Sequence, residues 1–275
     1  MPVLRSPCYI FSDTHLGAEP PGVERSLLSF MRHLAGRAGS LVINGDLFDF
    51  WFEWRTVIPR GSFRVLAALA ELRESGTDIV LIAGNHDCWG GDILRDDVGV
   101  RYMFGPWSGD LAGWRARVEH GDGLRPEGDR RYRMLRRLLR NGMAMGAFRL
   151  LHPDVGSRIA SGSSRASREH RAADDGVEIR SIASRQLHAH PGIDLLVYGH
   201  SHVAHLERLV AAGDPPHPAD HARGGEGVYA NAGSWLHDPT YVVVTPERIE
   251  LRRWDGSAEG DRLHAIDRRA EKALP

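Results

Sequence analysis

The chain has 275 residues, a hydrophobic content of 42% and a formal net charge of −1. These values predict one large globular domain or a domain with an insertion, and they exclude a protein that attracts its partners through a strong overall charge. The two cysteines exclude a disulfide framework.

The first part of the chain alternates short apolar runs with amphipathic stretches. The runs at residues 8–11, 40–43 and 78–83 are typical of buried strands. Between them, residues 23–37 and 62–75 have apolar side chains at helical spacing, and in the second stretch Phe63, Leu66, Leu69 and Ala70 are expected to face inward. This order of elements predicts an α/β fold with a parallel sheet and right-handed crossovers.

The second part of the chain adds further predicted strands at residues 115–118, 193–198, 227–232, 241–245 and 248–252. Residues 255–275 are charged and lack a clear period, so we expect a solvated C-terminal tail.

Five of the predicted strands are followed by polar clusters. Ligand sites in α/β sheets lie at the carboxyl ends of strands. The candidate ligands are Asp13, His15, Asp46, Asn85, His86, His120, His200 and His202. His200 and His202, at i and i+2, are expected to point the same way from extended backbone.

Each cluster alone has a structural explanation, since Asp46 suits a helix N-cap and turns rich in Asn and Asp are commonly solvated. Their joint occurrence predicts a metal centre with donors for two divalent ions. Oxygen and imidazole ligands suit Mn, Fe or Zn better than Ca. Two such ions suit a phosphoryl displacement.

The series DTH, GDLFD, GNHD, HGD and GHSH, between Asp13 and His202, resembles the motifs of the calcineurin-like metallophosphoesterase family. With the following NAGSW, the resemblance covers most of the chain. It implies a sandwich of two β-sheets flanked by helices, which the apolar pattern by itself supports only as an α/β sheet.

The resemblance also implies a role for each candidate. The first metal ion would be held by Asp13, His15, Asp46 and His202. The second would be held by Asp46, Asn85, His120 and His200, so that Asp46 bridges two ions. The Asp, His and Asn ligand set itself favours Mn²⁺ over Fe or Zn. His86 would contact the phosphate and assist the leaving group, Asn85 would share the catalytic role, and substrate would also contact Asn85 and His200.

Residues 123–190 differ in composition from the rest of the chain. They hold 14 Arg and no Lys against seven acidic residues, a net charge of about +7, so the remainder carries about −8. Basic and apolar side chains alternate at helical spacing over residues 130–140, and Met143, Met145, Phe148, Leu150 and Leu151 continue the apolar content. We expect an inserted helical cap here, between core segments 1–122 and 191–254. A basic helix that is merely solvated is the alternative.

Within the superfamily, the stretches GDLFDFW, HGDGLRPEGDRRY and FRLLHPDVGSRIA resemble the UDP-2,3-diacylglucosamine diphosphatase family of lipid A synthesis. In that family a helical cap covers the metal site and holds two acyl chains. An Asp-x-x-Tyr after the HGD motif implies Asp129 and Tyr132 as substrate contacts, with Ser164 and Arg168 as further contacts. Many members carry Arg where this chain has His86.

This second resemblance implies hydrolysis of the pyrophosphate of UDP-2,3-diacylglucosamine to UMP and 2,3-diacylglucosamine 1-phosphate. A nuclease or nucleotide phosphodiesterase is the alternative, but the basic segment has Leu, Met and Phe rather than spaced aromatic residues that stack on bases. Protein phosphatases differ at the positions of Phe50 and Asp87. A non-catalytic scaffold is disfavoured because every expected ligand is present.

We find no leader peptide and no apolar run long enough to span a bilayer, so we expect a cytoplasmic protein. The Arg-rich segment predicts peripheral association with the anionic inner face of the inner membrane. The expected partners are a nucleotide-linked glycolipid substrate and this membrane surface, without nucleic acid.

Overall fold

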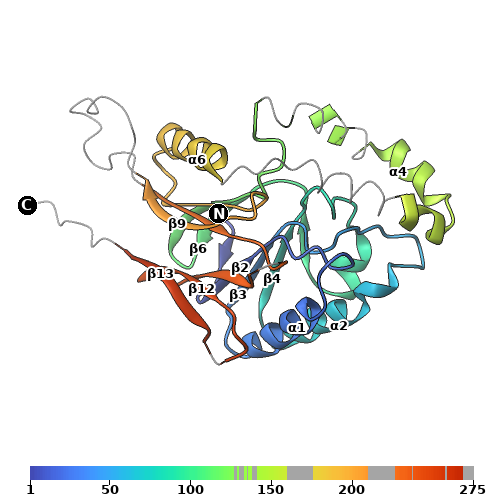
Figure 1. Ribbon diagram of the computed structural model, residues 1–275, viewed down its shortest axis with the longest axis horizontal. Helices are drawn as coiled ribbons and strands as arrows, with labels where there is room; N and C mark the ends of the chain where they lie inside the picture. Colours follow the sequence, from blue (N-terminus) through green and yellow to red (C-terminus); the bar gives the residue numbers. More distant parts are fainter. Residues whose placement is uncertain are drawn as a thin grey trace, which may run out of the picture.

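The computed structural model describes residues 1–126, 129, 133–134, 136–137, 141–159, 176–209, 227–236, 238–257 and 259–268. Within this part, two β-sheets pack face to face, with helices on their outer sides (Figure 1). One sheet has seven strands, in the spatial order β13 (Asp261–Asp267), β12 (Arg248–Arg253), β11 (Thr240–Val244), β2 (Cys8–Phe11), β3 (Ser40–Asn44), β4 (Asp78–Ile82) and β5 (Arg101–Met103).

The other sheet has six strands among the same residues, in the spatial order β1 (Val3–Leu4), β6 (Trp107–Leu111), β7 (Trp114–Val118), β8 (Leu195–Tyr198), β10 (Gly227–Ala232) and β9 (Ala204–Leu209). The helical elements with defined bounds are α1 (Val23–Leu34), the 3₁₀ turn η1 (Arg60–Ser62), α2 (Phe63–Glu74), the π-helical turn η2 (Ile93–Asp97), α4 (Gly142–Arg149) and α6 (Val177–Ala189). The sandwich of two sheets flanked by helices is therefore confirmed.

Alternate residues of the central strands serve different cores, which explains their unbroken apolar runs. In β4, Ile79 and Leu81 face the helices α1 and α2, whereas Val80 and Ile82 pack between the two sheets. Because successive side chains of a strand point to opposite faces, a strand covered on both sides is apolar at every position.

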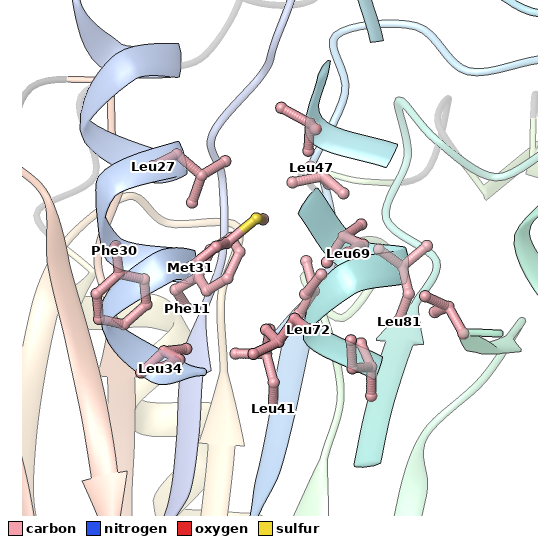
Figure 2. Packing of buried hydrophobic residues seen from close by; sticks show 14 of the residues in the cluster. Phe11, Leu27, Phe30, Met31, Leu34, Leu41, Leu47, Leu69, Leu72 and Leu81 are labelled. Atoms are coloured by element: carbon pink, nitrogen blue, oxygen red, sulfur yellow. The ribbon is translucent and has the colours of Figure 1, made fainter. Parts of the chain in front are cut away.

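The core outside the seven-stranded sheet is built by the apolar faces of α1 and α2. Figure 2 shows Phe30 and Met31 of α1 pointing toward the sheet, with Leu69 of α2 opposite and Leu41 of β3 below. The buried α1 residues recur at the three- and four-residue spacing of one helix face.

The helix α6 covers the outer face of the six-stranded sheet. Its Ile179, Ile182 and Leu187 are buried against Leu196 and Tyr198 of β8. α6 lies at the end of the segment expected to form a cap, and it forms an outer layer of the sandwich. In Figure 1, α4 lies apart from α6 along the same side of the molecule.

Most predicted elements are confirmed, and β2, β3 and β4 are parallel as expected. The helix predicted over 23–37 ends at Leu34, because Ala35 is extended, with ψ of 124°. Phe63 was expected to face inward, which is wrong: it is 67% exposed at the first position of α2. Residues 261–267, within the expected tail, instead form β13, whose side chains are mostly exposed.

Candidate metal centre

The polar turns after the strands contain an unusual concentration of left-handed backbone. Of the six non-glycine residues with positive φ in the described part of the chain, five are Asp13, His15, Asp46, His200 and His202, with φ between 47° and 62°. Such conformations are costly for non-glycine residues and cluster at functional sites. His200 and His202 are thus not on extended backbone, so the expected reason for their shared direction is wrong.

A first group of ligand-type side chains joins the turn after β2 to the turn after β8. Nε2 of His202 lies 3.1 Å from Oδ1 of Asp13, and Nε2 of His15 lies 3.3 Å from Nε2 of His202. Oδ2 of Asp13 accepts a hydrogen bond from the backbone N–H of His200 at 3.1 Å. One carboxylate oxygen is therefore held by the backbone, while the other faces two imidazole rings.

A second group combines Asp46, His120 and His200, whose ligand atoms lie within 4.8 Å of one another. Nε2 of His120 lies 3.3 Å from Oδ2 of Asp46, and Nδ1 of His120 lies 2.8 Å from the carbonyl oxygen of Asn44. Because a carbonyl can only accept, Nδ1 carries a proton, so in the neutral ring Nε2 presents its lone pair toward Asp46.

The two groups meet at one atom. Oδ2 of Asp46, which faces His120, also lies 3.6 Å from Nε2 of His15. The other oxygen, Oδ1, accepts a hydrogen bond from the backbone N–H of His86 at 2.9 Å. Gly84 permits this approach, because a Cβ atom there would overlap Oδ1 of Asp46.

The charges of the buried groups are strongly coupled. Burial acts to raise the pKa of Asp46, but His120 reverses this effect and holds that pKa well below its ordinary value. Burial acts to lower the pKa of His120, and the Asp46 carboxylate raises it well above its ordinary value. The pKa of Asp13 is also lowered, since His202 outweighs burial, whereas burial lowers the pKa of His15 to about 3. The carboxylates are therefore ionised and His15 is neutral near pH 7, whereas His120, whose pKa is raised, has to release a proton when a metal ion binds.

Several buried acceptor atoms of the centre lack a hydrogen-bond partner among the described residues: Oδ1 of Asp13, Oδ2 of Asp46 and Oδ1 of Asn85. A buried carboxylate oxygen without a partner is costly unless a cation compensates it. The surrounding donors are imidazole nitrogens and carboxylate or amide oxygens. This set fits a divalent metal site.

Sequence reasoning missed one residue of the centre, the buried Asp49. Its Oδ1 lies 3.5 Å from Nδ1 of His86 and 3.8 Å from Nδ1 of His15, and its backbone carbonyl lies 3.0 Å from Nδ1 of His86. Asp49 therefore holds the ring of His86 through its backbone carbonyl and lies beside the ring of His15. The available signal was the second acidic residue of GDLFD, three positions after Asp46.

The turns are joined to one another by further buried hydrogen bonds. Asp87 accepts from the backbone N–H groups of Gly84 and Leu47, each at 2.8 Å, which ties the turn after β3 to the turn after β4. Burial, and then the charge of Asp46, raises the pKa of Asp87 to about 6.

The NAGSW block supports the centre from β10. Ser234 donates to the backbone carbonyl of Asp13 at 2.9 Å, and Asn231 donates to the carbonyl of Gly199 at 3.0 Å. These bonds fix the turns that carry Asp13 and His200, which gives the block a structural role that its sequence did not indicate.

Of the four substrate contacts expected in the inserted segment, the structure describes only Asp129. Asp129 is buried, its carboxylate accepts from the backbone N–H of Arg125 at 3.0 Å, and its carbonyl accepts from the N–H of Arg133 at 2.8 Å. Tyr132, Ser164 and Arg168 lie outside the described residues.

Comparisons with known proteins agree with this centre. The family model described as calcineurin-like phosphoesterase matches residues 6–204. A UDP-2,3-diacylglucosamine hydrolase from Porphyromonas gingivalis is 33% identical over 73% of this chain and 84% of its own length. A protein of the same name from Pseudomonas putida is 30% identical over 75% of this chain and 86% of its own length. The solved structure of a Vps29 variant from Entamoeba histolytica covers 95% of this chain and 99% of its own, at 15% identity and a TM-score of 0.44, too distant to bear on function.

Proposed function

Because this chain belongs to the calcineurin-like phosphoesterase family, and is thus a metal-dependent phosphoesterase, we propose that it hydrolyses the pyrophosphate of UDP-2,3-diacylglucosamine to UMP and 2,3-diacylglucosamine 1-phosphate. The observation that carries the reaction class is the single oxygen of Asp46 that faces both groups of histidines. The substrate class is taken from the relatives that align over about three quarters of the chain.

The proposed cofactor is a pair of divalent metal ions, with Mn²⁺ preferred. One would be held by Asp13, His15, Asp46 and His202, and the other by Asp46, Asn85, His120 and His200. When bound, such ions polarise a phosphoryl oxygen and lower the pKa of water.

His86 is the proposed acid of the reaction. Its Nδ1–H donates a hydrogen bond to the carbonyl of Asp49 at 3.0 Å, so Nε2 is the atom left to face substrate. As an acid, the ring would carry a second proton on Nε2 and transfer it to the departing oxygen, which returns the ring to its neutral form. Asn85 and His200 are the further proposed substrate contacts at the centre, and Asp129, Tyr132, Ser164 and Arg168 those of the cap.

The experiment that tests this function is product analysis with synthetic UDP-2,3-diacylglucosamine, after chelation and again with added Mn²⁺. We expect UMP and the acylated sugar 1-phosphate in equal amounts, with activity lost on chelation and restored by Mn²⁺. Cleavage of nucleotide diesters or nucleic acid, with no release of UMP from the lipid, would favour a nucleotide phosphodiesterase instead.

The part of the inserted segment 123–190 that precedes α6 is proposed as the cap that binds the acyl chains, since α6 itself packs on β8 as a layer of the sandwich. Its described residues expose large apolar side chains, among them Met134, Met143, Leu150, Val155 and Ile159. The segment also carries 14 arginines, which suit phosphate oxygens.

We therefore expect the acyl chains to dominate substrate binding. Burying each methylene contributes about 0.8 kcal/mol, so UDP-glucosamine without acyl chains should show kcat/KM lower by at least about 100-fold than the diacyl substrate. The measurement is kcat/KM for both compounds below the aggregation limit of the lipid. Equal values would refute the lipid assignment and leave the metal centre as described.

None of the helices in the described residues is long and apolar enough to cross a bilayer. We propose peripheral binding to an anionic membrane through the Arg-rich segment, with about 1 kcal/mol per contacting basic residue. Binding to phosphatidylglycerol vesicles should therefore weaken strongly between about 0.1 M and 1 M salt, because the screening length falls from about 10 Å to about 3 Å. Vesicle flotation at the two salt concentrations measures the bound fraction. Binding that does not depend on salt would contradict an electrostatic contact.

A further inference from the structure

Five aromatic side chains from three separate parts of the chain form one cluster, here called the aromatic box: Phe50, Phe52, Trp54, Trp89 and Phe148. The ring of Phe148, in α4, lies 4.8 Å from that of Phe52, 5.0 Å from that of Trp89, and 6.2 Å from those of Phe50 and Trp54, measured between centroids. These separations are those of favourable aromatic pairs.

Among the described residues, little else anchors the helix α4. All eight of its residues are described and none is fully buried, and Met143 is 83% exposed. The indole N–H of Trp54 donates to the carbonyl of Leu151 at 3.2 Å, just beyond the helix. A Cβ atom at Gly156 would lie 3.0 Å from the Trp54 ring and 3.2 Å from Phe148, so the next helical stretch, 153–159, also packs closely on the box.

The opposite wall of the box belongs to two of the turns that carry the metal centre, those after β3 and β4. Phe50 directly follows Asp49, and the backbone N–H of Trp51 donates to the carbonyl of His86 at 3.3 Å. Trp89 lies three residues after His86. The surface on which Phe148 rests is therefore continuous in the chain with these turns.

A buried carboxylate fixes this wall. Glu53 accepts hydrogen bonds from the indole of Trp51 at 3.2 Å and from the backbone N–H groups of Gly91 and Ile93 at 2.8 and 2.9 Å. Glu53 thus joins the residues after β3 to the loop that follows Trp89. These hydrogen bonds of the wall do not involve Phe148.

We propose that Phe148 is a positioning residue, which fixes the inserted segment against the two turns that carry Asp46, Asp49, Asn85 and His86. This inference rests on the proposed function, because it assumes a lipid substrate whose acyl chains contact the inserted segment. With Phe148 in the box, the segment is already in place when the lipid arrives, so binding does not have to order it.

The test compares Phe148→Ala with Phe63→Ala, since Phe63 is an exposed phenylalanine of α2 away from the box. Without substrate, we expect amide hydrogen exchange across residues 143–150 to accelerate at least about tenfold in Phe148→Ala, the effect of losing one or two aromatic pairs. Exchange in β3 and β4 should stay unchanged. Phe63→Ala should leave both regions unchanged.

With substrate, Phe148→Ala should raise KM for UDP-2,3-diacylglucosamine about tenfold and change kcat by less than about threefold, because the reacting groups are untouched. Its kcat/KM for bis(p-nitrophenyl) phosphate, which has no acyl chains, should equal that of the unsubstituted protein. Phe148→Trp should restore the lipid KM by restoring a ring to the box.

Unchanged hydrogen exchange at 143–150, or an equal loss of kcat/KM on both substrates, would overturn the proposal. Failure of the unsubstituted protein to hydrolyse the lipid would refute the proposed function alone, because the exchange measurement reads the box without substrate. If Phe148→Ala does not fold, Phe148→Leu gives the same comparison with a smaller change in volume.

Discussion

Replacement of Asp46 by Ala is expected to lower kcat/KM by at least about 10³-fold and to reduce metal content at both positions. The reason is geometric: Oδ2 of this one residue lies 3.3 Å from Nε2 of His120 and 3.6 Å from Nε2 of His15. The same side chain holds the backbone of His86 through Oδ1 at 2.9 Å. No other described residue approaches both histidine groups and the His86 turn in this way.

The variants Asp46→Asn and Asp78→Asn sharpen the test. Asp46→Asn keeps an oxygen for the His86 N–H and loses the charge, so we expect lower metal content with the His86 turn in place. Asp78 is a half-buried carboxylate at the start of β4, the strand's other end from Asn85 and His86, where it pairs with Arg5 at 3.0 Å. Asp78→Asn should keep full metal content and activity.

Metal content by elemental analysis and kcat/KM at saturating Mn²⁺ are the two measurements. Retention of both ions and of most activity in Asp46→Ala would show that Asp46 is not the shared ligand. A uniform loss in Asp78→Asn would indicate that activity follows overall stability instead.

The location of the centre could be predicted from the sequence because it depends on local features. The strands β2, β3, β4 and β8 are each marked by an apolar run, and candidate ligands follow each of them closely, whereas His120 follows β7, in which arginine and apolar residues alternate. Parallel strands place their carboxyl ends at one edge of a sheet, so Asp13, Asp46 and Asn85 had to converge once β2, β3 and β4 were parallel.

The division into two sheets could not be predicted from the apolar pattern. β4 and β8 are both apolar at nearly every position, since each is covered on both faces. In β8, Leu195 and Val197 face the other sheet whereas Leu196 and Tyr198 face α6. Which sheet a strand joins is decided by partners far away in the chain, such as the pairing of β8 with β10.

Three features were not predicted correctly from the sequence: β13, Asp49, and the backbone of His200 and His202. β13 is an exposed edge strand whose charged side chains pair across to β12, as in Arg262 with Glu250 at 3.3 Å, so it has no apolar period. Asp49 was overlooked because its role depends on two histidines from other turns. His200 and His202 reach different groups through left-handed backbone, which a strand-based spacing rule does not foresee.

Replacement of His86 by Ala is expected to lower kcat by roughly 10²–10⁴-fold, the usual range for a positioned acid–base group. His86 is buried, its Nδ1 faces the Asp49 carbonyl at 3.0 Å, and its ring lies 4.6 Å from the ring of His15 in an edge-to-face contact. Its backbone N–H holds Asp46 and does not depend on the side chain. Metal content should therefore stay near normal in His86→Ala.

The choice of leaving group shows whether His86 acts as a general acid or as a metal ligand. If His86 protonates the departing oxygen, a substrate that leaves as p-nitrophenolate should be hydrolysed by His86→Ala with a much smaller loss than the lipid substrate, because that anion needs little protonation. The matched control is His33→Ala. His33 is a half-buried histidine of α1 that packs on Trp254, away from the metal centre, so kcat on both substrates should be unchanged. Loss of a metal ion from His86→Ala, with equal losses on both substrates, would instead make His86 a ligand: its ring lies beside His15 and Asp49, close enough for the three to hold an ion together.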